Sequence, residues 1–424
     1  MPSEQTLVPK QLPSDTHEVI AVLESIHVPW EDFDSSPRTH EVLLYQNTNA
    51  KEDDVVARIK DASIVICTTC KLPAETLKQA PYLKCIITHS VGTDHIDLAH
   101  CRQNNIQVMN CTDCNTETVA EHAMALYLAT RRSLVTIHNA LMPMPMPMPI
   151  PTSSSPSASA SASASAPAPA GPNVWKTRGS MNGLMRDGTG APPRTCAQEV
   201  VGIVGYGAVG RHIARLCRAL GMRVSISGRK GGDDGDGAVV RGLSSATSSS
   251  SSTSPSSRPS GDRKEEEEEE EKEEEDEQRL PFTTILSQST VLFLSLPLTP
   301  TTANTISTPE LTHMRPDATI INVSRGGIVD EPAVVHALST GRIFGYGTDV
   351  FAREPAGDAG DSVLLGPEVR ERGLNLTLTG HLAWFSQTTL VNQVRRVREN
   401  LRAYVDGDEG RLCENYVPYG IKVI

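Results

Sequence analysis

A glycine loop between a predicted strand and a predicted helix constrains the fold more than any other feature of the chain. The loop consists of Gly205, Tyr206, Gly207, Ala208, Val209 and Gly210. It follows an apolar stretch at 200–204 and opens an amphipathic stretch at 211–220. Gly205 permits a tight turn, Gly207 lets a phosphate approach the backbone, and Gly210 lets the helix pack against the sheet. Because the free N–H groups of a helix start bind phosphate, the unit predicts a dinucleotide-binding Rossmann domain.

The residues after the next predicted strand, 223–227, indicate which dinucleotide binds. NAD sites usually place an acid about 20 residues beyond the glycines, where it binds the ribose 2′-hydroxyl. This chain has Arg229 and Lys230 there and no acid. Two cations suit a 2′-phosphate and favour NADP(H), with NAD(H) as the alternative. The other interpretation is an ordinary solvated basic loop.

Two low-complexity segments interrupt the chain, at 142–172 and 231–279. The first is rich in proline, serine and alanine, and the second in glycine, serine and glutamate, so neither has the apolar area to form a core. We predict that both are disordered insertions. The second holds 16 acids and 6 bases, which accounts for −10 of the net charge of −12. The rest of the chain therefore has no basic field for nucleic acid.

The cysteines and the hydropathy pattern indicate the compartment. Nine cysteines occur with a polar N-terminus and no secretory signal, and no apolar run is long enough to span a membrane. We expect a cytoplasmic protein that does not bind membranes. The CxxC spacings at 67–70 and 111–114 can hold zinc or serve redox chemistry. Because each pair follows a predicted strand, the pattern favours buried apolar packing, and we expect no metal.

The order of predicted elements alternates strand and helix. The predicted strands lie at 18–23, 42–45, 63–67, 83–88, 106–109, 200–204, 223–227, 290–296, 318–322, 343–350 and 374–378. A long helix is predicted from 116 to 139 and a final helix from 386 to 404. This alternation predicts an α/β protein with two doubly wound parallel sheets.

Several motifs, in one order, resemble the D-isomer-specific 2-hydroxyacid dehydrogenase family. Besides the glycine loop they are HSVGTDHIDL at 89–98, NTETVAEHA at 115–123, LPLTP at 296–300, NVSRGGIVDE at 322–331, TDVFAREP at 348–355 and TGH at 379–381. The resemblance covers nearly everything outside the two insertions. It implies a flavodoxin-like substrate domain of 18–113 with 398–424, and a Rossmann NAD(P)-binding domain of 114–397.

The resemblance assigns three catalytic roles. Arg325 would bind the substrate carboxylate and keto oxygen through its planar fork and stabilise charge on that oxygen. His381 would donate the proton in reduction and accept it in oxidation, since imidazole serves both directions. Glu354 would orient His381 and favour its protonated form. The alternatives are a surface ion pair for Arg325 and a core histidine for His381; His122, on an apolar helix, is expected to be structural.

The resemblance also implies binding residues. The substrate carboxylate would meet the backbone of Ser90, Val91 and Gly92. Cofactor contacts map to Thr118, Leu296, Pro297 and Asp349, besides the glycine loop, Arg229 and Lys230. The loop HLAWFS at 381–386 resembles the branch of C-terminal binding proteins. Trp384 would face an apolar substrate side chain, or it would simply pack beneath the loop.

Two classes of function follow from these residues. The first is an NADP(H)-linked reductase that converts a small 2-keto acid to a D-2-hydroxy acid, acting as a homodimer. The second is a corepressor-like scaffold that binds the dinucleotide as a regulatory ligand. The carboxylate and carbonyl that Arg325 would bind are common to many keto acids, so the sequence leaves the substrate open.

Overall fold

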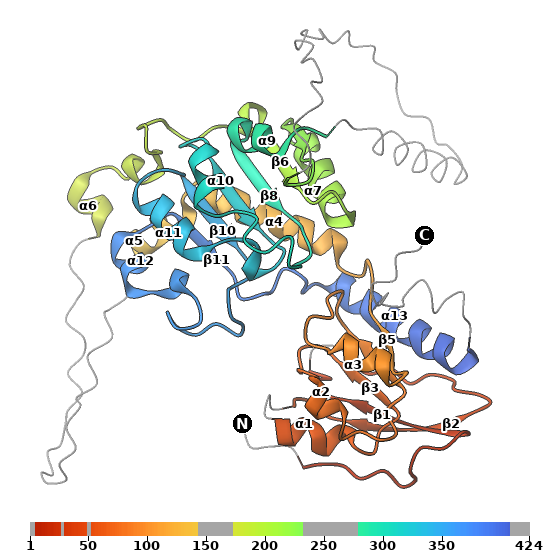
Figure 1. The fold of residues 1–424 in the computed structure, drawn as a ribbon. Helices are drawn as coiled ribbons and strands as arrows, with labels where there is room; N and C mark the ends of the chain where they lie inside the picture. Colours follow the sequence, from red (N-terminus) through yellow and green to blue (C-terminus); the bar gives the residue numbers. More distant parts are fainter. Residues whose placement is uncertain (1–4, 27–28, 49–51, 143–172, 232–278, 408–424) are drawn as a thin grey trace, which may run out of the picture. The chain divides into compact units, whose positions relative to one another are not determined.

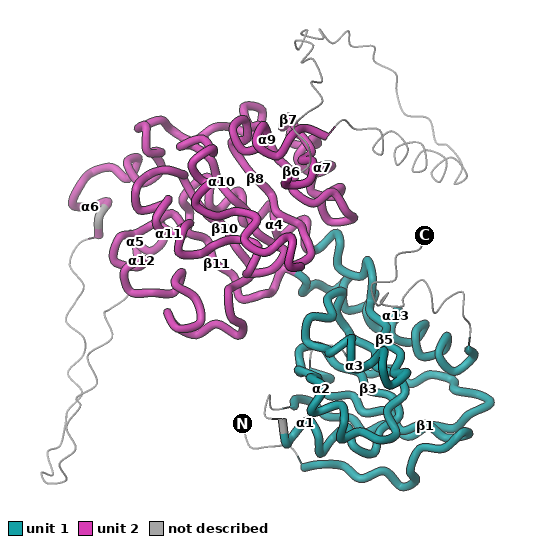
Figure 2. The backbone as a smooth tube through the Cα atoms, viewed as in Figure 1, with its two compact units in different colours: residues 1–118, 384–424 teal, residues 119–383 magenta. Residues whose placement is uncertain are grey.

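The structure, a computed structural model, describes residues 5–26, 29–48, 52–142, 173–231 and 279–407. Apart from their terminal residues, the two predicted insertions lie outside the described residues. The chain divides into two compact units, residues 1–118 with 384–424, and residues 119–383 (Figure 2). Each unit is built on one parallel sheet, which confirms the predicted fold class.

Unit 1 contains a five-stranded parallel sheet (Figure 1). Its strands are β1 His17–Val22, β2 Thr39–Leu44, β3 Ile64–Cys67, β4 Cys85–Thr88 and β5 Gln107–Met109. They lie in the order β2-β1-β3-β4-β5, which is the flavodoxin-like order. Successive residues of β1 enter two different cores, Val19 and Ala21 on one face and Ile20 and Val22 on the other. The sheet is therefore buried on both faces, as expected for parallel strands.

Helices cover the two faces of this sheet from distant parts of the chain. One face packs against α1 Glu52–Ile59, α2 Ala74–Leu77 and α3 Leu98–Gln103. The other face packs against α13 Gln387–Asp406, whose Val397 and Leu401 are buried beside β4. The C-terminal helix therefore completes the core of the N-terminal sheet.

Unit 2 contains a six-stranded parallel sheet in the order β11-β10-β9-β8-β6-β7. Its strands are β6 Val200–Val204, β7 Arg223–Ile226, β8 Val291–Leu294, β9 Thr319–Asn322, β10 Gly345–Thr348 and β11 Leu376–Leu378. On one face lie α4 Thr116–Arg131 and α7 Ala208–Ala219, and on the other α9 Phe282–Gln288, α10 Thr308–His313 and α11 Glu331–Ser339. The chain runs from β6 to β7 on one side and then crosses back to β8 on the other side of β6, so the reversal of strand order lies beside the glycine loop.

Smaller elements connect these layers. They are α5 Leu134–Leu141, α6 Val174–Arg178, α12 Pro367–Arg372 and the short 3₁₀ turns η1 Asn182–Met185, η2 Cys196–Gln198, η3 Gly326–Ile328 and η4 Val363–Leu365. The predicted single helix 116–139 was wrong, because α4 ends at Arg131 and α5 begins at Leu134. Ser133 has a left-handed φ of +49°, which interrupts the helical hydrogen bonds.

The contact boundaries between the units differ from those expected. They fall at 118/119 and 383/384 instead of 113/114 and 397/398. At the second boundary α13 begins at Gln387 and its Val397 and Leu401 pack in the core of unit 1, so the whole helix belongs to unit 1. That unit 1 binds substrate and unit 2 the cofactor stays a prediction.

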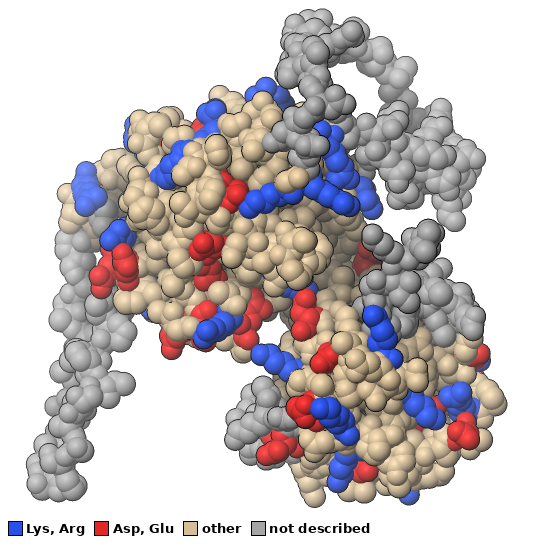
Figure 3. Space-filling view, in the orientation of Figure 1, with Lys and Arg blue, Asp and Glu red and all other residues tan. Residues whose placement is uncertain are grey.

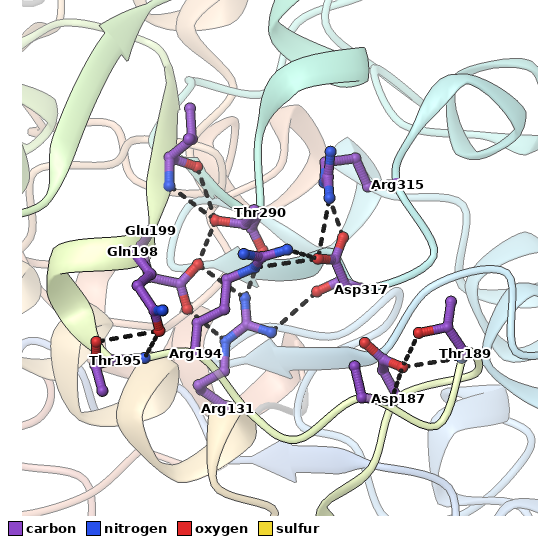
Figure 4. Close-up of polar contacts among 12 residues, drawn as sticks. Arg131, Asp187, Thr189, Arg194, Thr195, Gln198, Glu199, Thr290, Arg315 and Asp317 are labelled. Carbon is purple, nitrogen blue, oxygen red and sulfur yellow. Dashed lines mark hydrogen bonds and ion pairs between the residues drawn. The ribbon is translucent and has the colours of Figure 1, made fainter.

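A network of arginines and carboxylates lies at the amino edge of the unit 2 sheet (Figure 4). Arg131 is 3% exposed, and its Nε lies 2.7 Å from Oε1 of the fully buried Glu199. Its Nη1 donates to the Asp317 carbonyl at 2.9 Å and its Nη2 to the Thr290 carbonyl at 2.7 Å. The pair therefore joins the end of α4 to the starts of β6, β8 and β9.

The described cysteines are free thiols, and most are buried in the cores. Those of the two CxxC spacings are between 0% and 5% exposed. Burial raises the pKa of each of these thiols, that of Cys114 to about 11. In the described part of the chain, the helices are too short or too polar to cross a membrane.

Candidate active site

The parallel topology of unit 2 collects the predicted site residues at one edge of its sheet. His381 follows β11, Asp349 and Glu354 follow β10, and Arg325 follows β9. The glycine loop follows β6, next along the sheet after β8, and Arg229 follows β7 at the sheet's end. The carboxyl edge therefore carries acid–base groups at one end and phosphate-binding groups at the other, in line with the binding rule for such sheets.

The glycine loop has the geometry that a pyrophosphate requires. Gly205 has a φ of +97°, and a side chain there would lie 2.5 Å from the Ser295 carbonyl oxygen. At Gly207, in contrast, a Cβ would meet no described atom within 4 Å. The backbone between β6 and α7 is therefore open to a ligand at the position where the helix presents its first N–H groups. This chain fits a dinucleotide phosphate here.

The two cations after β7 have different surroundings. Lys230 Nζ lies 2.8 Å from Glu310 Oε1 and donates to the Thr305 carbonyl at 3.0 Å. Glu310 belongs to the capping box of α10, so the lysine is tied to that helix. Arg229 is exposed at the end of β7. Basic side chains also form a row across unit 2 in the view of Figure 3.

Arg325 stands at the start of η3, directly beyond β9. Its Nη1 donates to the Ser324 carbonyl at 2.8 Å, and the Asn322 side chain donates to the Arg325 carbonyl at 3.0 Å. The next residue, Gly326, packs so closely on the Phe351 carbonyl that a Cβ would overlap it. This contact joins the loop of Arg325 to the loop of Glu354.

His381 and Glu354 form a close pair. His381 Nδ1 lies 2.6 Å from Glu354 Oε2, so the long segment between them does not separate them. Glu354 Oε1 also accepts the Phe351 amide at 2.9 Å. Burial acts to raise the pKa of Glu354, but the bond and charge of His381, the Phe351 amide and the charge of Arg325 outweigh it, and the pKa falls below 4.5. At neutral pH this carboxylate is ionised and holds one nitrogen of the imidazole.

Asp349 fixes the loop that carries His381. The carboxylate is 1% exposed and accepts the amides of Leu382 at 2.9 Å and Ala383 at 2.8 Å, besides the Thr379 hydroxyl at 2.6 Å. His381 itself has a left-handed φ of +57°, which is unfavourable for a histidine. Both carboxylate oxygens of Asp349 accept hydrogen bonds within this loop. The expected contact of Asp349 with the cofactor stays a prediction. His122 lies behind it, with Nε2 2.9 Å from the Thr379 hydroxyl.

Residues 296 and 297 follow β8 on the same edge. The Leu296 amide donates to the Ser324 hydroxyl at 3.1 Å, and the Pro297 carbonyl accepts the Thr302 hydroxyl at 2.6 Å. These bonds shape the loop that lies between those of Arg325 and the glycines. Leu296 is half-buried and Pro297 exposed, so a ring of the cofactor can pack there.

The remaining predicted residues belong to unit 1. In the loop after β4, the Ser90 amide donates to the Thr88 hydroxyl at 3.2 Å. The contact of the Val91 and Gly92 amides with a substrate carboxylate stays a prediction. Thr118, expected at the cofactor, has its hydroxyl 2.7 Å from that of Ser386. The half-buried Trp384 stacks edge-on against Phe385, 5.3 Å between centroids.

The chain is similar to known proteins over the stretch that carries the site residues of unit 2. The sequence profile "D-isomer specific 2-hydroxyacid dehydrogenase, NAD binding domain" matches residues 176–250 and 261–383. The glycerate dehydrogenase of Methylorubrum extorquens is 29% identical over 379 residues, covering 88% of this chain and 92% of that protein. The chain therefore carries the NAD-binding domain of the D-isomer-specific 2-hydroxyacid dehydrogenase family. It is an NAD(P)-dependent dehydrogenase, which confirms the family and the enzyme class predicted from the motifs.

Solved structures of 2-hydroxyacid dehydrogenases share the fold. The D-lactate dehydrogenase of Aquifex aeolicus, complexed with NAD and lactic acid, has a TM-score of 0.60 and 22% identity and covers 94% of this chain and 98% of its own. An NADPH-dependent glyoxylate/hydroxypyruvate reductase of Sinorhizobium meliloti has a TM-score of 0.59 and 22% identity, covering 91% of this chain and 93% of its own. The fold is therefore found with either nicotinamide dinucleotide.

The Glu354–His381 pair predicts a pH-dependent stability. Because folding lowers the pKa of Glu354, its ionised form stabilises the native state above pH 4.5, and this stabilisation is lost as the pH falls through the lowered value. We expect Glu354→Gln to have a lower Tm than the native protein at pH 7 and the difference to shrink toward pH 3. Thermal unfolding of both proteins across that range measures it. A difference that is independent of pH would contradict the pairing.

Proposed function

We propose that the protein is an NADP(H)-preferring reductase that converts a small 2-keto acid, of the glyoxylate and hydroxypyruvate class, to the D-2-hydroxy acid. The observation that carries the proposal is the 2.6 Å His381–Glu354 pair at the same sheet edge as Arg325 and the open glycine loop. The relatives named glycerate dehydrogenase and glyoxylate/hydroxypyruvate reductase support the substrate class.

The residues of this chain divide the work of reduction. A bound nicotinamide supplies the hydride. Arg325 binds the substrate carboxylate and the keto oxygen, and it stabilises the negative charge that develops on that oxygen. The Nε2 of His381 delivers a proton to the same oxygen, while Nδ1 is held by Glu354. The amides of Val91 and Gly92 are the proposed second contact for the carboxylate, and Trp384 the contact for the substrate side chain.

Oxidation of NADPH and NADH against a panel of keto acids tests the function. The panel runs from glyoxylate and hydroxypyruvate through pyruvate to phenylpyruvate. We expect turnover that is fastest with NADPH and with the smaller acids. Dinucleotide binding without turnover of any acid would contradict the reductase and favour the corepressor-like scaffold.

Arg229 is the residue on which we base the cofactor preference. Since Lys230 is bound to Glu310, the charge-assisted contact to a 2′-phosphate falls to Arg229. Such a contact contributes about 1.5–3 kcal/mol, so we expect Arg229→Gln to raise the KM for NADPH by about 10- to 100-fold and to leave that for NADH within about twofold. The matched variant Lys230→Gln should change the NADPH KM much less. Equal effects of both variants on both cofactors would contradict this assignment.

We also propose a homodimer in the cytoplasm. Large apolar side chains of unit 2 are exposed on α4, α5 and α6, namely Leu128, Leu134, Val135 and Trp175, with Trp175 at 60%. Exposed apolar residues on adjoining elements are typical of an interface. Light scattering during gel filtration measures the mass, and Leu134→Glu is expected to shift it to that of one chain. A monomeric native protein would contradict the proposal.

Free thiols support the reducing compartment, and localisation of the tagged chain tests it.

A further inference from the structure

Glu331 is a buried carboxylate behind the loop of Glu354. It is the first residue of α11 and is 3% exposed. Its Oε1 accepts the Ala352 amide at 2.7 Å, and its Oε2 accepts the Ser362 hydroxyl at 2.7 Å. Such burial of a carboxylate is costly unless its oxygens are satisfied. Starting α11 does not require a buried carboxylate, so the burial of Glu331 indicates a further role.

The amide that Glu331 binds is adjacent to the one that Glu354 binds. Ala352 donates to Glu331 and Phe351 to Glu354, so two carboxylates hold two consecutive amides of one loop. Because the Phe351 amide occupies Oε1 of Glu354, its Oε2 is directed to His381 Nδ1. The close packing of Gly326 on the Phe351 carbonyl leaves the loop no room on that side.

The two carboxylates also influence each other electrostatically. Burial raises the pKa of Glu331 above 4.5, and the charge of Glu354 adds to this rise, although the bonds from Ser362 and from the amides of Ala352 and Val363 oppose it. Loss of the Glu331 charge or of its hydrogen bonds is therefore expected to change the electrostatic environment and the position of Glu354.

We propose that Glu331 is a positioning residue, which holds the 351–354 loop so that Glu354 stays in contact with His381. It acts on Glu354 through the Ala352 amide and through its charge. The proposal rests on the reductase function given above. It predicts that a substitution at residue 331 has the same signature as one at residue 354, because both disturb the same imidazole.

Kinetics of Glu331→Gln, Glu354→Gln and the double variant test the proposal. A small displacement of a catalytic group reduces rate strongly. We expect Glu331→Gln to lower kcat about tenfold, to leave KM within about twofold, and to move the alkaline fall of the reduction rate to lower pH, and we expect the same direction of change for Glu354→Gln. The double variant should be no slower than Glu354→Gln alone, since the two changes act on one step. Additive losses with an unchanged pH profile would overturn the proposal.

A matched control separates positioning from simple loss of stability. Asp317→Asn removes a carboxylate that is bonded to Arg194 and Arg315 at the opposite edge of the same sheet. We expect it to lower Tm without moving the pH profile. Glu331→Asp keeps the charge but shortens the reach to Ala352, so it should resemble Glu331→Gln and serves if the latter does not fold. An aspartate variant with native kcat and pH profile would overturn the proposal.

A measurement without substrate keeps this proposal distinct from the reductase function. The imidazole Nδ1–H signal of His381, assigned by its absence in His381→Ala, is recorded by NMR in the native protein, Glu331→Gln and Glu354→Gln. We expect the downfield shift that the bond to Glu354 gives this proton to be smaller in both variants than in the native protein. A native shift in Glu331→Gln would overturn the positioning role, whereas absence of turnover in the native enzyme would contradict only the reductase.

Discussion

Replacing Arg325 with glutamine is expected to lower kcat/KM for keto acid reduction about a thousandfold. One oxyanion-stabilising donor is worth about 10²–10³ in rate, and Arg325 would also lose the ion pair with the substrate carboxylate. The loss should appear in both kcat and KM, because the guanidinium contacts substrate before and during hydride transfer. Steady-state kinetics with glyoxylate and NADPH measure it.

Two further variants make the Arg325 prediction specific. Arg325→Lys keeps the charge but lacks the planar fork, so we expect it to recover less than about a tenth of the lost activity. Arg342→Gln removes an arginine that lies before β10, at the amino edge of the sheet, and should retain native kinetics. Native activity in Arg325→Gln would show that another group binds the keto acid.

Replacing Arg131 with methionine is expected to destabilise the protein by about 3–5 kcal/mol. The substitution leaves the carboxylate of Glu199 fully buried without its cation. It also removes the donors to the carbonyls of Asp317 and Thr290. Chemical denaturation of the native and variant proteins measures the difference in the free energy of unfolding.

An exposed ion pair provides the control for Arg131. Arg372 and Glu368 lie one helical turn apart on α12, with their side chains 52% and 65% exposed. Because solvent screens such a pair, Arg372→Met should cost less than about 1 kcal/mol. Adding Glu199→Gln to Arg131→Met should restore part of the lost stability, since no unpaired charge then remains. Similar losses for Arg131→Met and Arg372→Met would contradict the importance of burial.

The parts of the protein that follow local patterns were predictable from sequence. Apolar runs between turns mark the strands of both parallel sheets, although several strand ends differ from those expected: β10 Gly345–Thr348 is shorter and β2 Thr39–Leu44 longer. The spacing of Gly205, Gly207 and Gly210 predicts a dinucleotide-binding loop because a strand precedes it and a helix follows it. For Arg325 the family motif supplied the role, and the strand order then places it beside Glu354.

The parts that depend on contacts between distant residues were not predictable. Lys230 is bound to Glu310, which lies 80 residues further along the chain, and this ion pair had no local signal in the sequence. Glu331 stands in a recognisable motif, but its bond to the Ala352 amide forms only when β9 and β10 lie side by side. The helix break at Ser133 also had no signal in the sequence, because neither glycine nor proline lies between α4 and α5.

The buried thiols can report local opening of each unit. Cys67, Cys85 and Cys101 are fully buried in unit 1, and Cys217 is fully buried in unit 2. A thiol reacts with an alkylating reagent only as an accessible thiolate, and burial raises the pKa of Cys101 and Cys217 to about 12. Each cysteine is therefore labelled only when its surroundings open. The rate at which mass spectrometry finds each site modified in native buffer would rank the opening of the two units separately, without any engineered probe.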